Sequence, residues 1–450
     1  MNFFYIEKKI EDTRLSNFLK LERFSKISFM RSNFKKIIID SIPEKINVII
    51  IDEDELLETH HDDSTAIFWC SNIIHVNDQT QHQFIQKIAC SIFSLLFGTK
   101  NSYIFKGRLS QLKSILNDEA GSQILNLKNE THLKRILNIS DFREAITENS
   151  HTRHFNKILS NKERFTKVSA ETEKLESEFL FLKNIPEDLR KYYVQVFNFQ
   201  KNKVDASYTM QKIAGIDLSI AFINAPIRTD RVKNILQYLG YYFKDLKKHK
   251  SEKYVDNLKF IIDKNNERHD KLRQWKGYSK LNNFIKLHTS FNGVSDLYSD
   301  SNKHLKRYKK LLHTSYFSHG DLCLSNMIFS EEDNKITFID PRGGEAYRTP
   351  YYDLAKLSHS LLGGYDHIIN NIATIQFDNS MGAYVDFNEA LDQKIEGVFS
   401  DFCHSLGYEI ELVRKIEASL FISMLPLHVD DERKLFMLAL RASELLKLKI

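Results

Sequence analysis

Cysteine, proline and glycine are all scarce in this chain. Its 450 residues include four cysteines, six prolines and 15 glycines. The cysteines stand far apart and form no C-x-x-C pair, so neither a disulfide framework nor a zinc site of clustered thiols is expected. The chain has no stretch rich in proline, glycine or serine of the kind that is typical of linkers. Domain boundaries must therefore be inferred from changes in the residue pattern.

Long apolar runs are also missing. No run approaches the roughly 20 apolar residues that a bilayer-spanning helix needs. The first residues, MNFFYIEKKIEDTR, lack the apolar core and the small-residue cleavage site of a signal peptide, so we expect a cytoplasmic protein. The net charge of +5 is small and comes from scattered lysines. We therefore expect no membrane span and no nucleic-acid partner.

Residues 1–140 are predicted to form an N-terminal α/β domain. The run INVIII at 46–51 is rich in β-branched residues, and TAIFWCSNIIHV at 65–76 is a second strand region. Apolar residues then recur at helical spacing over 81–98. The sequence does not indicate what this domain does.

A different pattern begins near residue 150. Strands are expected at 154–160, 164–169, 192–200 and 204–213, with an amphipathic helix at 170–185. This order predicts a small antiparallel sheet with one inserted helix, over residues 145–215.

Residues 216–450 are predicted to be mainly helical. Apolar positions from Val232 to Leu246 mark one face of a long helix. One strand–turn–strand, NMIFS followed by KITFID, interrupts the helices at 326–340. The fold class is therefore α+β, with a small antiparallel sheet lobe, a mainly helical lobe and the extra N-terminal domain.

The residues around this strand–turn–strand indicate a chemistry. Asn326 stands where the first strand begins and Asp340 where the second ends, so a hairpin brings both side chains to the same end. Amide and carboxylate oxygens suit Mg²⁺, which takes few protein ligands and leaves room for phosphates. Asp321, on the preceding loop, is placed to accept a proton from an attacking hydroxyl. His319 is grouped with these catalytic candidates, although a structural role in the loop is the simpler explanation.

The motif as a whole resembles the protein-kinase-like superfamily and, within it, the aminoglycoside phosphotransferase and choline kinase branch. The superfamily's H-x-D-x-x-x-x-N appears here as HGDLCLSN, and the metal-binding aspartate stands in FIDPRGG. Further on, YYDLAKL carries Asp353 at the head of a helix, as the branch's D-L-A segment does. The resemblance covers about residues 150–440 and implies a bilobal kinase-like fold with ATP and Mg²⁺ as cofactors.

The resemblance also implies roles for residues before this loop. Lys167 would hold the α- and β-phosphates of ATP and pair with Glu178 on the next helix. The backbone of the linker between the lobes would contact adenine, with candidates Met210, Gln211, Lys212 and Ile213. Ser150 would help a loop at 146–158 to cover the phosphates. That loop has no glycine, which departs from the family's usual pattern, so how it covers the phosphates stays open.

Three residues near the hairpin are candidates for the acceptor site. Arg342 and Arg348 could bind an anionic acceptor or lie in solvent, and Tyr347 could stack on a sugar ring. An A-P-E segment is missing, and Cys323 stands where protein kinases carry a basic residue. We therefore predict ATP- and Mg²⁺-dependent phosphorylation of a small-molecule hydroxyl, on a sugar or related alcohol, with surface-glycan synthesis as one setting.

Two other functions fit the same pattern. The chain could be a catalytically weak kinase-like module that binds nucleotide or serves as a scaffold, and the glycine-free loop favours this. It could also be bifunctional, because the acids at 52–55 imitate the D-x-D site of nucleotidyl- and glycosyltransferases. A charged strand end is the commoner explanation of such acids.

Overall fold

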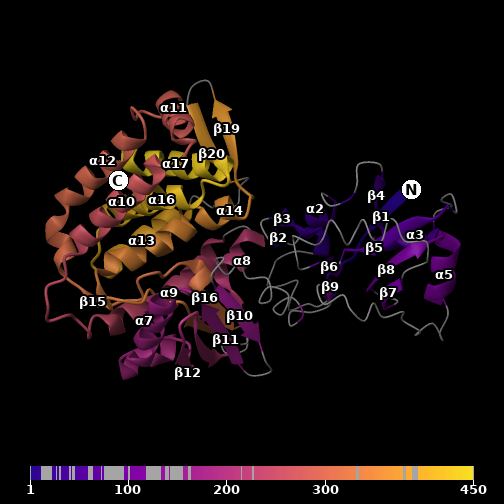
Figure 1. The fold of residues 1–450 in the computed structure, drawn as a ribbon, viewed down its shortest axis with the longest axis horizontal. Coiled ribbons are helices and arrows are strands. Elements are labelled where there is room, and N and C mark those ends of the chain that lie inside the picture. The colour runs from indigo at the N-terminus through magenta and orange to yellow at the C-terminus, as the bar shows by residue number, and fades with distance from the viewer. Residues whose placement is uncertain are drawn as a thin grey trace. The chain divides into compact units, whose positions relative to one another are not determined.

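The computed structural model describes residues 2–11, 23–26, 28–29, 32–39, 42, 46–58, 64–71, 73–75, 96–99, 102–117, 133–136, 141, 156–160, 164–213, 215–224, 228–330, 334–378, 382–387 and 394–448. The chain divides into two compact units, Met1–His154 and Phe155–Ile450, which are described separately (Figure 1). Within the described residues, no helix combines the length and the apolar character that crossing a membrane requires.

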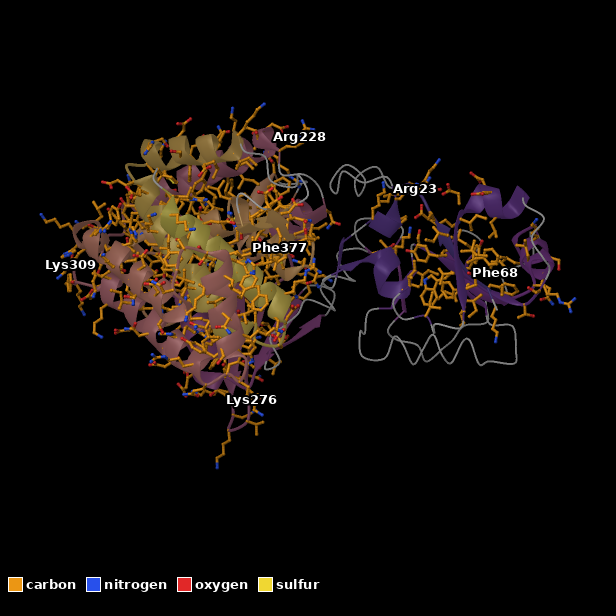
Figure 2. The ribbon with its side chains drawn as sticks, turned by 90° about the horizontal axis from the view of Figure 1, so that it is seen from above. Arg23, Phe68, Arg228, Lys276, Lys309 and Phe377 are labelled. Carbon is orange, nitrogen blue, oxygen red and sulfur yellow. The ribbon has the colours of Figure 1, made fainter. Side chains whose placement is uncertain are left out.

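The first unit is built on a mixed sheet with the strand order β4–β1–β5–β8–β7. Its strands are β1 (Asn2–Glu7), β4 (Asn47–Asp52), β5 (Ala66–Cys70), β7 (Leu96–Thr99) and β8 (Ser102–Gly107). β1 pairs in parallel with β4 and β5, whereas β8 is antiparallel to β5 and β7. Every residue of β5 is buried, as its unbroken apolar sequence AIFWC favours for a central strand. Phe68 of this strand lies in the core of the unit (Figure 2).

Part of this unit differs from the sequence prediction. The strands expected at 46–51 and within 65–76 are present, but β1, which pairs with both β4 and β5, was not predicted. Residues 96–98 belong to strand β7, so the prediction that a helix runs to Gly98 was wrong at its end. The rest of that predicted helix lies outside the described residues. The domain boundaries and the role of this domain stay predictions.

The second unit contains the predicted antiparallel sheet, in the order β10–β11–β13–β12. Its elements are β10 (Asn156–Ser160), β11 (Arg164–Ser169), α7 (Thr172–Lys183), β12 (Val196–Lys201) and β13 (Ala206–Gln211). The expected strand start at residue 192 was wrong, because Glu187–Tyr192 forms a 3₁₀ helix and β12 begins later. Lys167 of β11 is paired directly with Tyr208 of β13, so their side chains emerge on the same face of the sheet.

The remainder is mainly helical, which confirms the predicted α+β class with a small sheet lobe and a helical lobe. The main helices are α9 (Thr229–Leu246), α10 (Asn257–Arg273), α11 (Tyr278–His288), α12 (Val294–Arg307), α13 (Pro350–Leu361), α15 (Lys394–Ser405), α16 (Ile410–Met424) and α17 (Glu432–Lys447). Figure 1 shows α7 and the four-stranded sheet at one end of the unit and α10 to α17 toward the other. The predicted apolar face of α9 is buried throughout. A hairpin of β19 (Thr374–Asp378) and β20 (Gly382–Asp386) was not predicted.

The predicted strand–turn–strand is present as β16 (Met327–Ser330) and β17 (Lys335–Phe338). A short strand, β14 (Ile216–Asp217), completes a three-stranded sheet beside β16. β17 is also tied to the segment that follows α7, because Val194 N–H donates to the carbonyl oxygen of Phe338 at 3.0 Å. The hairpin is thereby attached to the chain of the sheet lobe.

Candidate active site

One buried ammonium joins three elements of the second unit. Lys167 Nζ, on β11, lies 2.7 and 2.9 Å from the two carboxylate oxygens of Glu178, on α7. The same nitrogen lies 3.1 Å from Asp340 Oδ1, just beyond β17. The sheet lobe, the helix α7 and the hairpin therefore all contact the ammonium group of Lys167.

The protein environment favours this arrangement. Lys167 and Glu178 are 4% and 7% exposed, so each charge requires a partner. Tyr208, the strand neighbour of Lys167, donates its hydroxyl to Glu178 Oε1 and orients the carboxylate. Burial alone would lower the pKa of Lys167, but the carboxylates of Asp340 and Glu178 raise it above its ordinary value. Lys167 is therefore a permanent cation.

Asp340 has an unusual backbone conformation. Its φ of 53° lies in the left-handed region, which costs a non-glycine residue roughly 1–2 kcal/mol and is concentrated at functional sites. The two strands before it pair Met327 with Phe338, and Ile339 N–H donates to the carbonyl oxygen of Asn326 at 3.0 Å. The predicted convergence of Asn326 and Asp340 at one end of the hairpin follows from this register.

The two side chains fit a divalent cation that uses few protein ligands. Asn326 Nδ2 donates to the main-chain oxygen of Asp321 at 2.8 Å, which fixes the amide and leaves Oδ1 as its ligating atom. Asp340 uses Oδ1 for Lys167, which leaves Oδ2 for a cation. Two hard oxygen donors with the rest of the shell open to phosphate and water is the usual composition of a Mg²⁺ site.

Asp321 makes an ion pair that the sequence did not reveal. Its Oδ1 lies 2.7 Å from Nζ of Lys356, on α13. Burial would raise the pKa of Asp321, but Lys356 outweighs it and holds the pKa well below the usual range. Asp321 is therefore ionised at any working pH, as a residue that orients and accepts a proton from a hydroxyl requires.

His319 has the contacts of a residue that shapes the loop. Its ring stacks on Tyr193 at 5.8 Å, Nδ1 accepts from the N–H of Asp321, and Nε2 lies 3.0 Å from the carbonyl oxygen of Ile339. Nε2 must therefore carry the proton. Burial lowers the pKa of His319, so the ring is neutral. These contacts support the structural role.

Asp353 accepts hydrogen bonds from the loop that carries His319 and Asp321. Its two oxygens accept from the hydroxyl of Ser318 at 2.7 Å and the N–H of Gly320 at 2.8 Å. Gly320 has a φ of +75°, which glycine adopts without strain. Two hydrogen bonds to Asp353 therefore hold this loop in place.

The loop after Asp340 packs tightly against α7. A Cβ atom built on Gly343 would lie 2.5 Å from the backbone nitrogen of Glu178 and 2.6 Å from the carbonyl carbon of Ser177. No side chain fits there without movement of the backbone. Gly343 therefore allows the chain that carries Asp340 to approach the helix that carries Glu178.

Four basic side chains gather beside Asp321. The guanidinium groups of Arg342 and Arg348 lie over the ring of Phe260, at 5.1 and 5.2 Å. Lys264, one turn along α10 from Phe260, donates to the hydroxyl of Tyr352 at 2.9 Å. With the lysine that pairs with Asp321, they form what we call the cationic cluster: Lys264, Arg342, Arg348 and Lys356.

Other predicted residues have different positions. The ring of Tyr347 meets Phe317 edge-on at 5.9 Å, and its stacking on a sugar ring stays a prediction. Met210 is buried, and Gln211 N–H already donates to the carbonyl oxygen of Gln195 at 2.9 Å. Lys212 is exposed and Ile213 half-buried. Ser150 lies outside the described residues, with most of its loop. The adenine contacts therefore stay predictions.

Lys356 and Lys264 were not predicted as site residues from the sequence. Lys356 stands three residues after Asp353 in the motif that was noticed, and that spacing on one helix face was a usable signal. Lys264 lies in a lysine-rich helix with no signal of its own.

Comparisons with known proteins found similarity in three-dimensional structure alone. No protein-family model and no curated protein sequence matches the chain. The aminoglycoside phosphotransferase APH(3'')-Id from Streptomyces rimosus, in complex with ADP and streptomycin, is 13% identical, with a TM-score of 0.39, covering 68% of this chain and 97% of its own. A thermostable mutant of the aminoglycoside phosphotransferase APH(4)-Ia, in complex with ADP and hygromycin B, is 10% identical to this chain, with a TM-score of 0.42. The similarity covers 68% of this chain and 97% of the chain of that mutant. A Plasmodium vivax ethanolamine kinase is 12% identical to this chain, with a TM-score of 0.36. The similarity covers 69% of this chain and 88% of the kinase's chain.

Proposed function

We propose that the chain is an ATP- and Mg²⁺-dependent phosphotransferase that acts on a hydroxyl of a small molecule, a sugar or related alcohol. The observation that carries the proposal is the single ammonium of Lys167 held by both Glu178 and Asp340, at 2.7 and 3.1 Å. In kinases, a carboxylate on a helix positions the lysine that binds the phosphates, and this lysine lies beside a metal ligand. Glu178 is the helix carboxylate here, and Asp340 is the proposed metal ligand.

Each residue then has a defined task. Lys167 would bind the α- and β-phosphates, and Asn326 and Asp340 would hold Mg²⁺, which would supply positive charge to offset that of the phosphates. Asp321 orients the acceptor hydroxyl. The acceptor oxygen bonds to the γ-phosphorus as the bond to the ADP oxygen breaks, and the hydroxyl proton passes to Asp321. Because phosphoryl transfer needs little covalent help, positioning and charge account for most of the rate.

The decisive experiment is a screen of sugars and amino alcohols for acceptor-dependent release of ADP. Asp321→Asn is expected to lower kcat about 10²–10⁴-fold, the range for a general base, while ATP binding is retained. Asp340→Ala is expected to abolish Mg²⁺-dependent transfer. Asp401→Asn, an exposed aspartate on α15, serves as the matched control. Turnover in Asp321→Asn equal to that of the unmodified chain would refute the assignment.

A further inference from the structure

The cationic cluster lies where an acceptor must bind. Lys356 links it directly to Asp321 through the 2.7 Å ion pair. A Cβ atom built on Gly320 would lie 3.0 Å from Cβ of Arg342 and 3.2 Å from Nη1 of Arg348. Both arginines therefore lie against the loop that carries Asp321. The rings of Phe260 and Tyr352, 5.6 Å apart, hold the basic side chains together.

The basic groups of this region have few carboxylates in direct contact with them. Among the described residues, neither Lys264 nor Arg342 nor Arg348 forms an ion pair with a carboxylate. Asp321 is paired with Lys356. Asp353, which accepts two hydrogen bonds from the loop, and Glu345 attract Arg348 without forming an ion pair with it. Glu267, also on α10, is exposed and paired with Lys271.

These basic groups also act on a neighbouring phenol. Burial would raise the pKa of Tyr352, yet Lys264, Arg342 and Lys356 lower it to about 8. Gathering like charges in a half-buried place is unfavourable unless an anion binds among them. Paired guanidinium groups supply the planar donor geometry that phosphate and carboxylate oxygens accept.

We infer that the acceptor carries an oxyanion, as a sugar phosphate or a sugar acid does, and that this group binds the cationic cluster while the hydroxyl faces Asp321. The inference rests on the proposed transfer reaction and narrows its substrate class. An acceptor with several amino groups, such as an aminoglycoside, would be repelled by Lys264, Arg342 and Arg348.

The first test measures anion binding without turnover. The full chain, saturated with Mg·ADP so that the nucleotide site is filled, is titrated with inorganic phosphate and with glucuronate. Lys264→Met and Arg342→Met are each expected to weaken binding about 10- to 100-fold, the usual range for one charged hydrogen bond. Lys259→Met is the matched control, because Lys259 is exposed on the same helix and pairs with Asp263. Affinity unchanged in both variants, or no binding to the unmodified chain, would overturn the inference.

The second test measures turnover with matched acceptors: glucose, glucosamine, glucuronate and glucose 6-phosphate. Anionic members are expected to have the higher kcat/KM, with KM for them raised in Lys264→Met and KM for ATP unchanged. Faster transfer to glucose or glucosamine would overturn the inference and leave the proposed function standing. Absence of transfer to every acceptor in the wider screen would overturn the proposed function, while the titration would still decide whether the cluster binds anions.

Discussion

Removal of the Lys356 charge should change both the rate and its dependence on pH. The ammonium lies 2.7 Å from Asp321 Oδ1 and keeps the pKa of that carboxyl low against the opposing effect of burial. An opposite charge at close range lowers a carboxyl pKa by about 1–3 units. Lys356→Met should therefore raise the pKa of Asp321 by about that amount, because the effect of burial is no longer offset.

The loss of kcat/KM in Lys356→Met should depend on pH. In the unmodified chain, protonation of Asp321 lies below the usual carboxyl range, so it should produce no loss of kcat/KM between about pH 5 and 8. In Lys356→Met, the pKa of Asp321 should return toward the usual carboxyl range, so an acidic limb of kcat/KM should enter as pH falls toward about 4. At pH 8, where Asp321 is ionised in both, a remaining loss of about 10- to 100-fold is expected, since one charged hydrogen bond contributes about 1.5–3 kcal/mol.

The assay is acceptor-dependent ADP release, measured as kcat/KM across the pH range. Lys356→Arg preserves the charge and should keep the profile of the unmodified chain. Lys276→Met, at an exposed position in the same unit (Figure 2), is the matched control. A loss in Lys356→Met that is the same at every pH would refute the reasoning, because it would show that the ammonium does not act through the charge of Asp321.

Three further predictions concern other parts of the second unit. Lys167→Met removes the ammonium shared by Glu178 and Asp340, and KM for ATP should rise about 10- to 100-fold; an unaltered KM contradicts the phosphate-binding role. Gly343→Ala places a Cβ atom 2.5 Å from the backbone nitrogen of Glu178, so kcat/KM should fall more than about 10-fold with helical content kept, and full activity would show that this close approach is dispensable. Asp366 is buried, and burial raises its pKa to about 6, so the folded state binds the extra proton and gains stability as pH falls from about 6 to 4. Asp366→Asn should therefore stabilise the fold by up to about 3 kcal/mol at pH 8 and much less at pH 4 in urea unfolding; a gain independent of pH would argue against this.

Residues close together in the chain were predicted well. The hairpin places Asn326 and Asp340 at one end because its turn is short and the pairing of Met327 with Phe338 follows from it. The apolar periodicity of α9 also predicted a buried face correctly. The resemblance to kinases predicted the pairing of Lys167 with Glu178, which periodicity alone could not.

Several of the failures involve partners distant in sequence. The pairing of β1 with β4 and β5 brings together residues about 45 and 65 positions apart, and a short strand has too few positions to reveal its neighbours. The hydrogen bond from Lys264 to Tyr352 spans 88 residues. Lysines on a polar helix have the same local pattern whether they face water or a buried ring.

The chain's local chemistry, in its turn residues, its apolar spacing and the motif from His319 to Asp340, was sufficient to predict most elements of the second unit and the candidate site residues on the hairpin and its loop. The charge around those groups depended on how α10 and α13 pack, which placed Lys264 and Lys356 beside Tyr352 and Asp321. Local periodicity determines which face of a helix is apolar, whereas close packing between helices determines which charges meet.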